Sequence, residues 1–166
     1  MRISWFLAIL IGLFTLELLE PVHQAVILPF TALVASVSAG ITTLFDSAVQ
    51  AEGIIIRSLS NGAAVAIQPG CNGVEAMICL TAAIVAFTAS WQSKIVGLVM
   101  GFMAIQLLNI VRIISLFYLL QWNKDWFEWA HIYLWQALII LDALIVFIIW
   151  IRLIPKLDGK LVKATG

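Results

Sequence analysis

Long apolar runs dominate the sequence, and short polar stretches separate them. The run from Ala25 to Phe45 carries no charge, and the runs at 72–93, 95–123 and 130–151 each contain a single Asp, Glu, Lys or Arg. A membrane-spanning helix needs roughly 20 mainly apolar residues, and in lipid its backbone polar groups must be paired within the helix. The pattern predicts an all-α polytopic membrane protein with about five transmembrane helices, at about 3–19, 25–45, 72–90, 94–121 and 131–151.

The longest stretch outside these predicted spans is residues 46–70. Within it, apolar residues typical of strands at 53–56 and 64–67 flank the pair Asn61-Gly62. An Asn-Gly pair between two such runs is a hairpin signal. We therefore predict a small extracytoplasmic β-hairpin between the second and third spans. Because no internal repeat or second domain is evident, residues 1–166 are expected to form a single transmembrane domain.

Composition supports a membrane protein and excludes other classes. Hydrophobic residues make up 63% of the chain and charged residues 11%, against roughly 25% charged residues in soluble domains. The nine basic and nine acidic residues cancel, so there is no basic field to attract nucleic acid. High hydrophobicity with no net charge also excludes disorder. The lipid bilayer is the expected environment, and nucleic acid is not an expected partner.

The basic residues predict an orientation in the membrane. Four of them follow the last predicted span, in a polar tail at 152–166: Arg152, Lys156, Lys160 and Lys163. Because basic residues near span ends favour the cytoplasm, we expect a cytoplasmic C-terminus and a multi-pass protein of the cytoplasmic (inner) membrane. Counting back through five spans places residues 46–71 and 122–131 outside, and Met1 outside as well. The first apolar run has no small-residue cleavage site, so we expect it to be retained as a span.

Three reactive side chains are predicted to lie at one outer level of the membrane. Cys71, Arg112 and His131 are separated by similar lengths of chain from the cytoplasmic ends of their spans, which lie at Trp91, Lys94 and Ile151. At the helical rise of about 1.5 Å per residue, these separations correspond to about 30, 27 and 30 Å from the same cytoplasmic face. Three different spans would thus deliver a thiol, a guanidinium and an imidazole to one depth.

The three groups together fit cysteine chemistry on a carbonyl. The segment Pro69-Gly-Cys-Asn-Gly73 indicates a turn before the third span, and a helix N-terminus with an Arg nearby favours a thiolate at Cys71. His131 could take and return a proton, and Arg112 could bind developing negative charge. The competing interpretation is a buried Cys with an interfacial Arg and His. In that case the chain would be a non-catalytic membrane subunit or transporter component.

Neighbouring polar residues are candidates for supporting roles. Glu75, one turn inward from Cys71, either binds Arg112 or is protonated and structural. Asn109 could orient Arg112 or a substrate backbone. Cys71 and Cys79 have a spacing typical neither of a redox pair nor of a zinc site. No metal or organic cofactor is indicated.

The motifs around these residues resemble the exosortase/archaeosortase family. The resemblance rests on Pro69-Gly-Cys-Asn-Gly-Val74, on Asn109-Ile-Val-Arg-Ile113, and on His131 at the start of the last span. It covers roughly residues 45–150, and the short chain looks most like the exosortase H type. By this resemblance Cys71 is the nucleophile, Arg112 the transition-state or substrate-binding residue and His131 the proton shuttle. Asn72, which follows Cys71 in the first motif, is a candidate for a substrate-binding or supporting role.

The resemblance implies a membrane-embedded cysteine protease or transpeptidase. Such enzymes act on membrane-anchored protein substrates with C-terminal sorting tails, each made of a short motif, a hydrophobic helix and a basic end. The implied cleavage takes place on the outer face of the membrane, where an amine or water resolves the acyl-enzyme.

Overall fold

The computed structural model describes the backbone of residues 3–165 and the side chains of residues 3–154. Most of this chain is helical, and two short segments, η1 and η2, are π-helical turns that continue neighbouring helices. The helical elements are α1 (Ile3–Leu18), α2 (Glu20–Val22), η1 (His23–Ile27), α3 (Leu28–Thr42), α4 (Val74–Ala86), α5 (Trp91–Trp122), α6 (Lys124–Trp129), η2 (Ala130–Leu134) and α7 (Trp135–Thr165). The predicted tail is thus a continuation of α7, although its side chains from residue 155 lie outside the described residues.

Within the part of the chain that the structure describes, three helical stretches are long and apolar enough to cross a membrane. They are Glu20–Thr42, Trp91–Trp122 and Lys124–Ile154, which overlap the predicted spans at 25–45, 94–121 and 131–151. The other two predicted spans are apolar helices of only 16 and 13 residues, α1 and α4. The count of five spans is therefore not confirmed. Helix α4 is shorter than the third predicted span at both ends: residues 72 and 73 belong to the loop around the site described below, and the helix ends at Ala86, before an extended Phe87.

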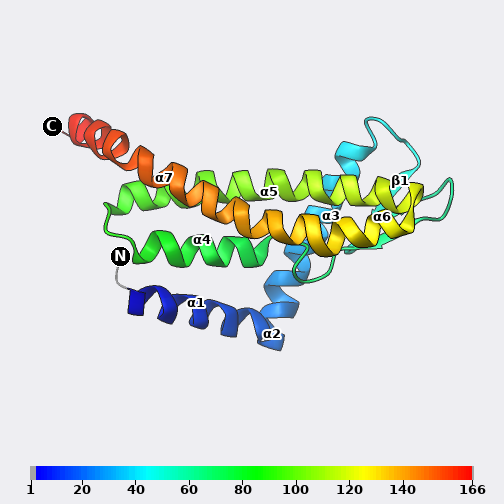
Figure 1. The fold of residues 1–166 in the computed structure, drawn as a ribbon, viewed down its shortest axis with the longest axis horizontal. Helices are drawn as coiled ribbons and strands as arrows, with labels where there is room; N and C mark the ends of the chain where they lie inside the picture. Colours follow the sequence, from blue (N-terminus) through cyan, green and yellow to red (C-terminus); the bar gives the residue numbers. More distant parts are fainter. Residues whose placement is uncertain (1–2, 166) are drawn as a thin grey trace.

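The first helix is arranged differently from our prediction. Figure 1 shows α1 beside α4, and the beginning of α1 lies at the same end of the long axis as the end of α7. We predicted Met1 on the face opposite the C-terminus; Met1 itself lies outside the described residues, but the direction of α1 disagrees with that prediction. At Leu19 the backbone is extended, and the chain then continues into α3 without reversing its direction along the long axis (Figure 1).

A three-stranded antiparallel sheet lies at the other end of the molecule (Figure 1). Its strands are β1 (Val49–Glu52), β2 (Ile55–Ser58) and β3 (Ala64–Ala66), in the order β1-β2-β3. The hairpin predicted around Asn61-Gly62 is present as β2 and β3, and β1 is an additional strand. Gly62 has a φ of +74°, which the turn requires and which glycine adopts without a steric penalty.

Two apolar clusters hold these parts together. One joins the sheet to α3 and α5 and consists of Val34, Ala35, Ala39, Val49, Ile56, Ile67, Ile113 and Phe117. The other joins α4, α5 and α7 and consists of Ala76, Leu80, Ile84, Ile105, Ala143 and Trp150. Helix α5 contributes to both clusters, so it fixes the position of the sheet relative to α4 and α7.

The helices of the second cluster approach closely at a glycine of α5. A Cβ atom at Gly97 would lie 2.3 Å from Nε1 of Trp150, so only glycine allows this contact. The same indole nitrogen donates a hydrogen bond of 2.9 Å to the Ser93 carbonyl. Nearby, the ammonium of Lys94 donates to the Val85 carbonyl over 2.8 Å, which satisfies an acceptor at the C-terminal end of α4.

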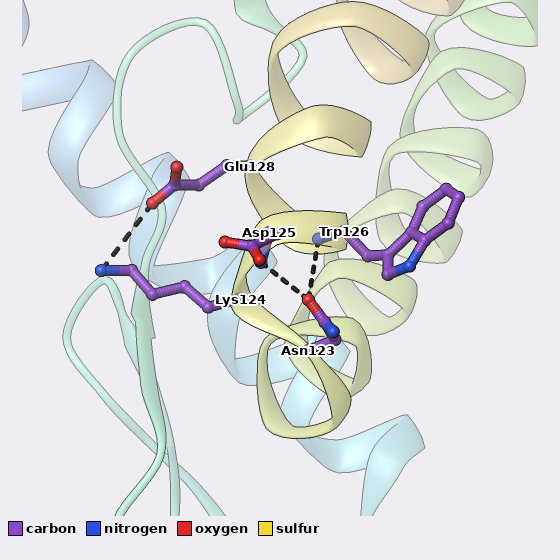
Figure 2. Close-up of polar contacts among 5 residues, drawn as sticks. All are labelled: Asn123, Lys124, Asp125, Trp126 and Glu128. Carbon is purple, nitrogen blue, oxygen red and sulfur yellow. Dashed lines mark hydrogen bonds and ion pairs between the residues drawn. The ribbon is translucent and has the colours of Figure 1, made fainter.

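The chain reverses direction at Asn123, between α5 and α6. The side-chain oxygen of Asn123 accepts hydrogen bonds from the backbone N–H groups of Asp125 (2.8 Å) and Trp126 (3.1 Å), as Figure 2 shows. This is the usual way in which an Asn caps a helix N-terminus. Lys124 and Glu128 form an exposed ion pair of 3.8 Å one turn apart. The connection between α5 and α7 is thus a capped helical turn, after which α7 packs back along α5.

Candidate active site

Cys71 lies in the loop between β3 and α4, three residues before Val74, the first residue of that helix. Its backbone N–H donates a hydrogen bond of 2.9 Å to the Gln68 carbonyl, which closes a tight turn over Pro69-Gly70. Gly70 has a φ of +85°, a left-handed conformation that favours glycine. The turn is what the Pro-Gly sequence predicts, and it directs the thiol toward α5 and η2.

Arg112 of α5 lies directly behind this turn and is only 1% exposed. Its Nη1 donates to the Gly70 carbonyl over 3.1 Å, and its Nη2 lies 3.4 Å from the Cys71 sulfur. One guanidinium therefore holds the loop backbone and contacts the thiol at the same time. The third nitrogen, Nε, has no hydrogen-bond partner among the described residues.

His131 contacts the same sulfur atom. Its Nε2 lies 3.2 Å from the Cys71 sulfur. The imidazole stacks on the ring of Phe127, with 5.8 Å between centroids and 4° between planes. Because Asn123 reverses the chain, η2 packs back toward α5, and His131 reaches the loop that Arg112 holds. The structure thus brings the three predicted side chains together at one sulfur atom.

Glu75 supports the loop in a way that we did not predict. Its carboxylate accepts a hydrogen bond from the Gly70 backbone N–H. No ion pair joins Glu75 to Arg112 in the described part of the chain. The two side chains instead hold opposite ends of one residue, since Glu75 binds the Gly70 amide and Arg112 binds its carbonyl. The carboxylate therefore acts on the site through the backbone.

Asn72 ties the loop to α3 and to the start of α4. It is fully buried; its Nδ2 donates to the Thr31 hydroxyl over 3.0 Å, and its Oδ1 accepts from the Val74 N–H over 3.0 Å. The backbone carbonyl of Asn72 accepts a hydrogen bond of 3.1 Å from Nε2 of Gln106, which lies in α5. Gln106 and Thr31 are polar partners that periodicity could not identify, because each is a single polar residue in an apolar run.

Asn109 lies beside this loop. Among the described residues, no hydrogen bond joins it to Arg112. Its Nδ2 lies 3.5 Å from Oε1 of Gln106, at the limit of a hydrogen bond, and its buried Oδ1 has no partner there. A Cβ atom at Gly73 would lie 3.4 Å from Asn109 Nδ2. The contacts of Asn109 are therefore with the loop and Gln106.

We predict that Gly73→Ala destabilises the protein and distorts the loop. Gly73 has a φ of +80°, and an added Cβ would lie 2.7 Å from Nε2 of Gln106. The left-handed conformation alone costs a residue with a Cβ about 1–2 kcal/mol, and a displaced Gln106 loses its bond to Asn72. Thermal unfolding in detergent should show a lower midpoint. Gly40→Ala is the matched control, since its Cβ meets nothing within 4 Å; equal stability of the two variants would contradict this account.

The thiol is not the stabilised thiolate that we predicted. Burial raises the pKa of Cys71 above its ordinary value, and the nearby Arg112 opposes that shift only in part. The negative charge of Glu75 raises the pKa further, to a smaller extent. The prediction failed because Cys71 lies before the helix, in a partly buried turn, where desolvation of the charged form is the largest influence. A resting thiol at neutral pH needs a base in order to react.

A cavity of about 400 Å³ opens at the sulfur. Its lining consists of the continuous segment 64–69 and Cys71, of Arg112, Ile113, Leu116 and Leu120 of α5, and of Phe127 and His131. This volume lies within the range of ligand sites, which are mostly apolar with a few convergent polar groups. The reactive atoms thus face a space that a substrate can enter.

The second histidine and the second cysteine of the chain line other cavities. The other histidine, His23, lines a separate cavity of about 430 Å³ with Glu17, Glu20 and Glu75. Cys79 lines a third, apolar cavity beside α7. Among the described residues, no group of three or more His, Cys, Asp and Glu side chains is placed to hold a metal ion. The chemistry available at the site is that of Cys71, Arg112 and His131.

Comparison with known proteins agrees with the resemblance in the motifs. The family model for the transmembrane exosortase (EpsH) matches residues 1–151, which includes every residue of the site. No curated protein and no solved structure matches the chain. With a match over most of its length and several apolar helices, the chain is a multi-pass membrane protein that belongs to the transmembrane exosortase family.

Proposed function

We propose that this protein is a membrane-embedded cysteine peptidase or transpeptidase that removes C-terminal sorting tails from exported proteins. The observation that carries the proposal is the contact of one thiol with two groups. His131 Nε2 lies 3.2 Å and Arg112 Nη2 lies 3.4 Å from the Cys71 sulfur, at the wall of a 400 Å³ cavity. A nucleophile within hydrogen-bond reach of a base is the arrangement that covalent catalysis requires.

The first half of the proposed reaction forms an acyl-enzyme. The Cys71 sulfur attacks the carbonyl carbon of the scissile peptide bond, and the thiol proton passes to Nε2 of His131. The carbonyl oxygen becomes an oxyanion next to the sulfur, where Nη2 of Arg112 can donate to it. The C–N bond then breaks, and His131 returns the proton to the leaving amine. The products are a thioester on Cys71 and the free hydrophobic tail.

The second half of the reaction resolves the thioester. An incoming amine or water loses a proton to His131 and attacks the thioester carbonyl. The C–S bond then breaks, and His131 gives the proton to the departing sulfur, which regenerates the thiol of Cys71. Arg112 binds the second oxyanion in the same position as the first. Attack by an amine gives transpeptidation, and attack by water gives hydrolysis. Both outcomes use the same three side chains.

The proposed orientation places this chemistry outside the cytoplasm. The basic residues that follow the last apolar run favour the cytoplasmic side of the inner membrane. Helix α7 runs from the end of the molecule that carries the sheet to the opposite end (Figure 1). With its C-terminal end in the cytoplasm, the sheet and the cavity lie toward the outer face. An exported substrate that is still held by its C-terminal hydrophobic helix would present its scissile segment there.

Processing of a reporter in membranes tests the proposal. The reporters are exported domains that carry C-terminal tails made of a short polar motif, a hydrophobic helix and a basic end. Each is co-expressed with the wild-type chain, and loss of the tail is followed by mass spectrometry. Removal of a tail only in cells that contain the wild-type chain supports the proposal. Absence of cleavage across a broad set of such tails, by a well-expressed chain, would overturn it.

We predict that His131→Ala lowers the rate of processing at neutral pH by about a hundredfold or more, the usual contribution of a general base. Because burial raises the pKa of Cys71, the thiol stays protonated when no base accepts its proton. A higher pH supplies thiolate directly, so the residual rate of the variant should rise steeply with pH and the wild-type rate much less. His23→Ala is the matched control. A variant with wild-type rate and pH profile would exclude His131 as the base.

A further inference from the structure

The free edge of β3 borders the same cavity as the reactive sulfur. In the described part of the chain, β3 ends the sheet and has a partner only on the β2 side. Each residue from Ala64 to Pro69 lines the cavity, and the strand leads directly toward Cys71. An unpaired strand edge presents backbone N–H and C=O groups that can pair with another chain.

The hydrogen bonds of the hairpin show which groups are free. Ser58 N–H donates to the Ala63 carbonyl over 2.8 Å, and Ile67 N–H donates to the Ile54 carbonyl over 2.9 Å. In an antiparallel pair, hydrogen-bonded residues recur at every second position, so Val65 directs its N–H and C=O toward β2, opposite Ile56.

Ala64 and Ala66 therefore direct their backbone groups away from β2, to the free edge. The side chains of both residues are also exposed methyl groups, so they do not obstruct the approach of a second backbone. A strand that paired with this edge would replace the water that now solvates these groups with peptide hydrogen bonds. Addition of a strand to an exposed edge is a common way in which proteins bind extended peptides.

We infer that β3 binds the substrate segment that precedes the scissile bond as a fourth strand of the sheet. This inference rests on the proposed function, because that function places the exported part of the substrate on the side of the sheet. The acyl segment runs toward Cys71, as the chain itself does from β3 through residues 67–70, so the added strand runs parallel to β3. The occupant is an extended peptide, recognised through its backbone and positioned with its last carbonyl at the sulfur.

Peptidyl chloromethyl ketones test the inference without a known substrate. Their peptide part occupies the acyl side, and the Cys71 sulfur displaces chloride from the methylene carbon to form a thioether. The probes are acetyl-Ala-chloromethyl ketone and acetyl-Ala-Ala-Ala-Ala-chloromethyl ketone, the second also with a single N-methyl group at each amide in turn. The rate of alkylation is measured by mass spectrometry in lipid nanodiscs, in a Cys79→Ala background.

The tetrapeptide is expected to alkylate Cys71 about tenfold faster than the single-residue probe, a gain that about two backbone hydrogen bonds would supply. N-methylation should abolish this gain at alternate residues, because only every second amide of an extended strand faces β3. Equal rates for the long and short probes would overturn the inference. So would a gain that survives N-methylation at every position, because apolar binding in the cavity would then explain it.

Proline substitutions test the same edge from the protein side. Proline is tolerated in an edge strand where its nitrogen faces away from the sheet, and Ala66→Pro removes one N–H from the free edge of β3. The ratio of long-probe to short-probe rates should fall toward one. Ala51→Pro in β1 is the matched control, since Ala51 also directs its N–H away from β2; this variant should keep the ratio.

These outcomes separate the inference from the proposed function. A wild-type ratio in Ala66→Pro would contradict binding at β3 even where the chain processes a reporter through Cys71. Conversely, if the chain processes no reporter but the probes show the alternating N-methyl pattern, peptide binding at β3 would be supported and the proposed reaction would be contradicted.

Discussion

Cys71→Ala is expected to abolish removal of the tail, with a loss of at least about a thousandfold in rate. The variant keeps the backbone hydrogen bond of the turn to Gln68 and the bond from Arg112 to Gly70, so the loop should keep its shape. It lacks only the atom that forms the thioester. Reporter processing in membranes, normalised to the amount of each variant, measures the effect.

Cys79→Ala is the control for this prediction. Cys79 is the other cysteine of the chain; it lies in α4 and lines a different cavity, so its replacement should leave processing close to wild type. Processing by Cys71→Ala at the wild-type rate would show that the cluster at the sulfur is structural. A non-catalytic membrane subunit would then be the better interpretation of the chain.

Arg112→Lys is expected to lower the rate of the chemical step by about a hundredfold while the charge is kept. Removing one donor to an oxyanion typically costs about 10²–10³ in kcat. The guanidinium reaches the Gly70 carbonyl and the sulfur with two different nitrogens. A lysine has one ammonium and cannot reproduce this fork. Single-turnover processing of a reporter measures the loss.

The design of this variant separates chemistry from stability. Arg112 is almost completely buried, so its replacement by alanine would also leave the Gly70 carbonyl unpaired, at a cost of about 1–3 kcal/mol. Lysine keeps much of the volume and the positive charge. Arg152→Lys, at an exposed position of α7, is the control. A wild-type rate for Arg112→Lys would show that positive charge alone is sufficient, and that the two-point geometry is not required.

The sequence predicted the main features of the site because they depend on the number of residues between each side chain and the end of its predicted span. Helical rise placed Cys71, Arg112 and His131 at one depth, and in the structure the guanidinium and the imidazole both lie within 3.4 Å of the sulfur. Rise along a helix does not depend on how the helices pack, which explains why this common depth could be predicted. Helical character, the hairpin and the family were also predicted correctly, because each has a local signal in the sequence.

The features that the sequence did not predict depend on packing and on the loop. The role of Glu75 could not be assigned, because a carboxylate one turn from Cys71 can reach either a side chain or the Gly70 amide. The third predicted span was too long at both ends, since residues 72 and 73 belong to the loop and α4 ends at Ala86, before an extended Phe87. The direction of α1 was wrong because basic-residue counting assumes that each apolar run crosses the membrane. The pKa of Cys71 was placed too low because its burial was not evident.

The central claim is that Cys71 forms a covalent thioester with its substrate. Wild-type protein in nanodiscs is mixed with an intact reporter that it is known to cleave. The reaction is quenched in acid and the protein is digested, and the peptide that contains Cys71 is analysed by mass spectrometry. We predict an adduct whose mass equals that of the acyl fragment and which neutral hydroxylamine removes. Cleavage of the reporter by Cys71→Ala, or by wild-type protein with no such adduct at any time during turnover, would contradict the account.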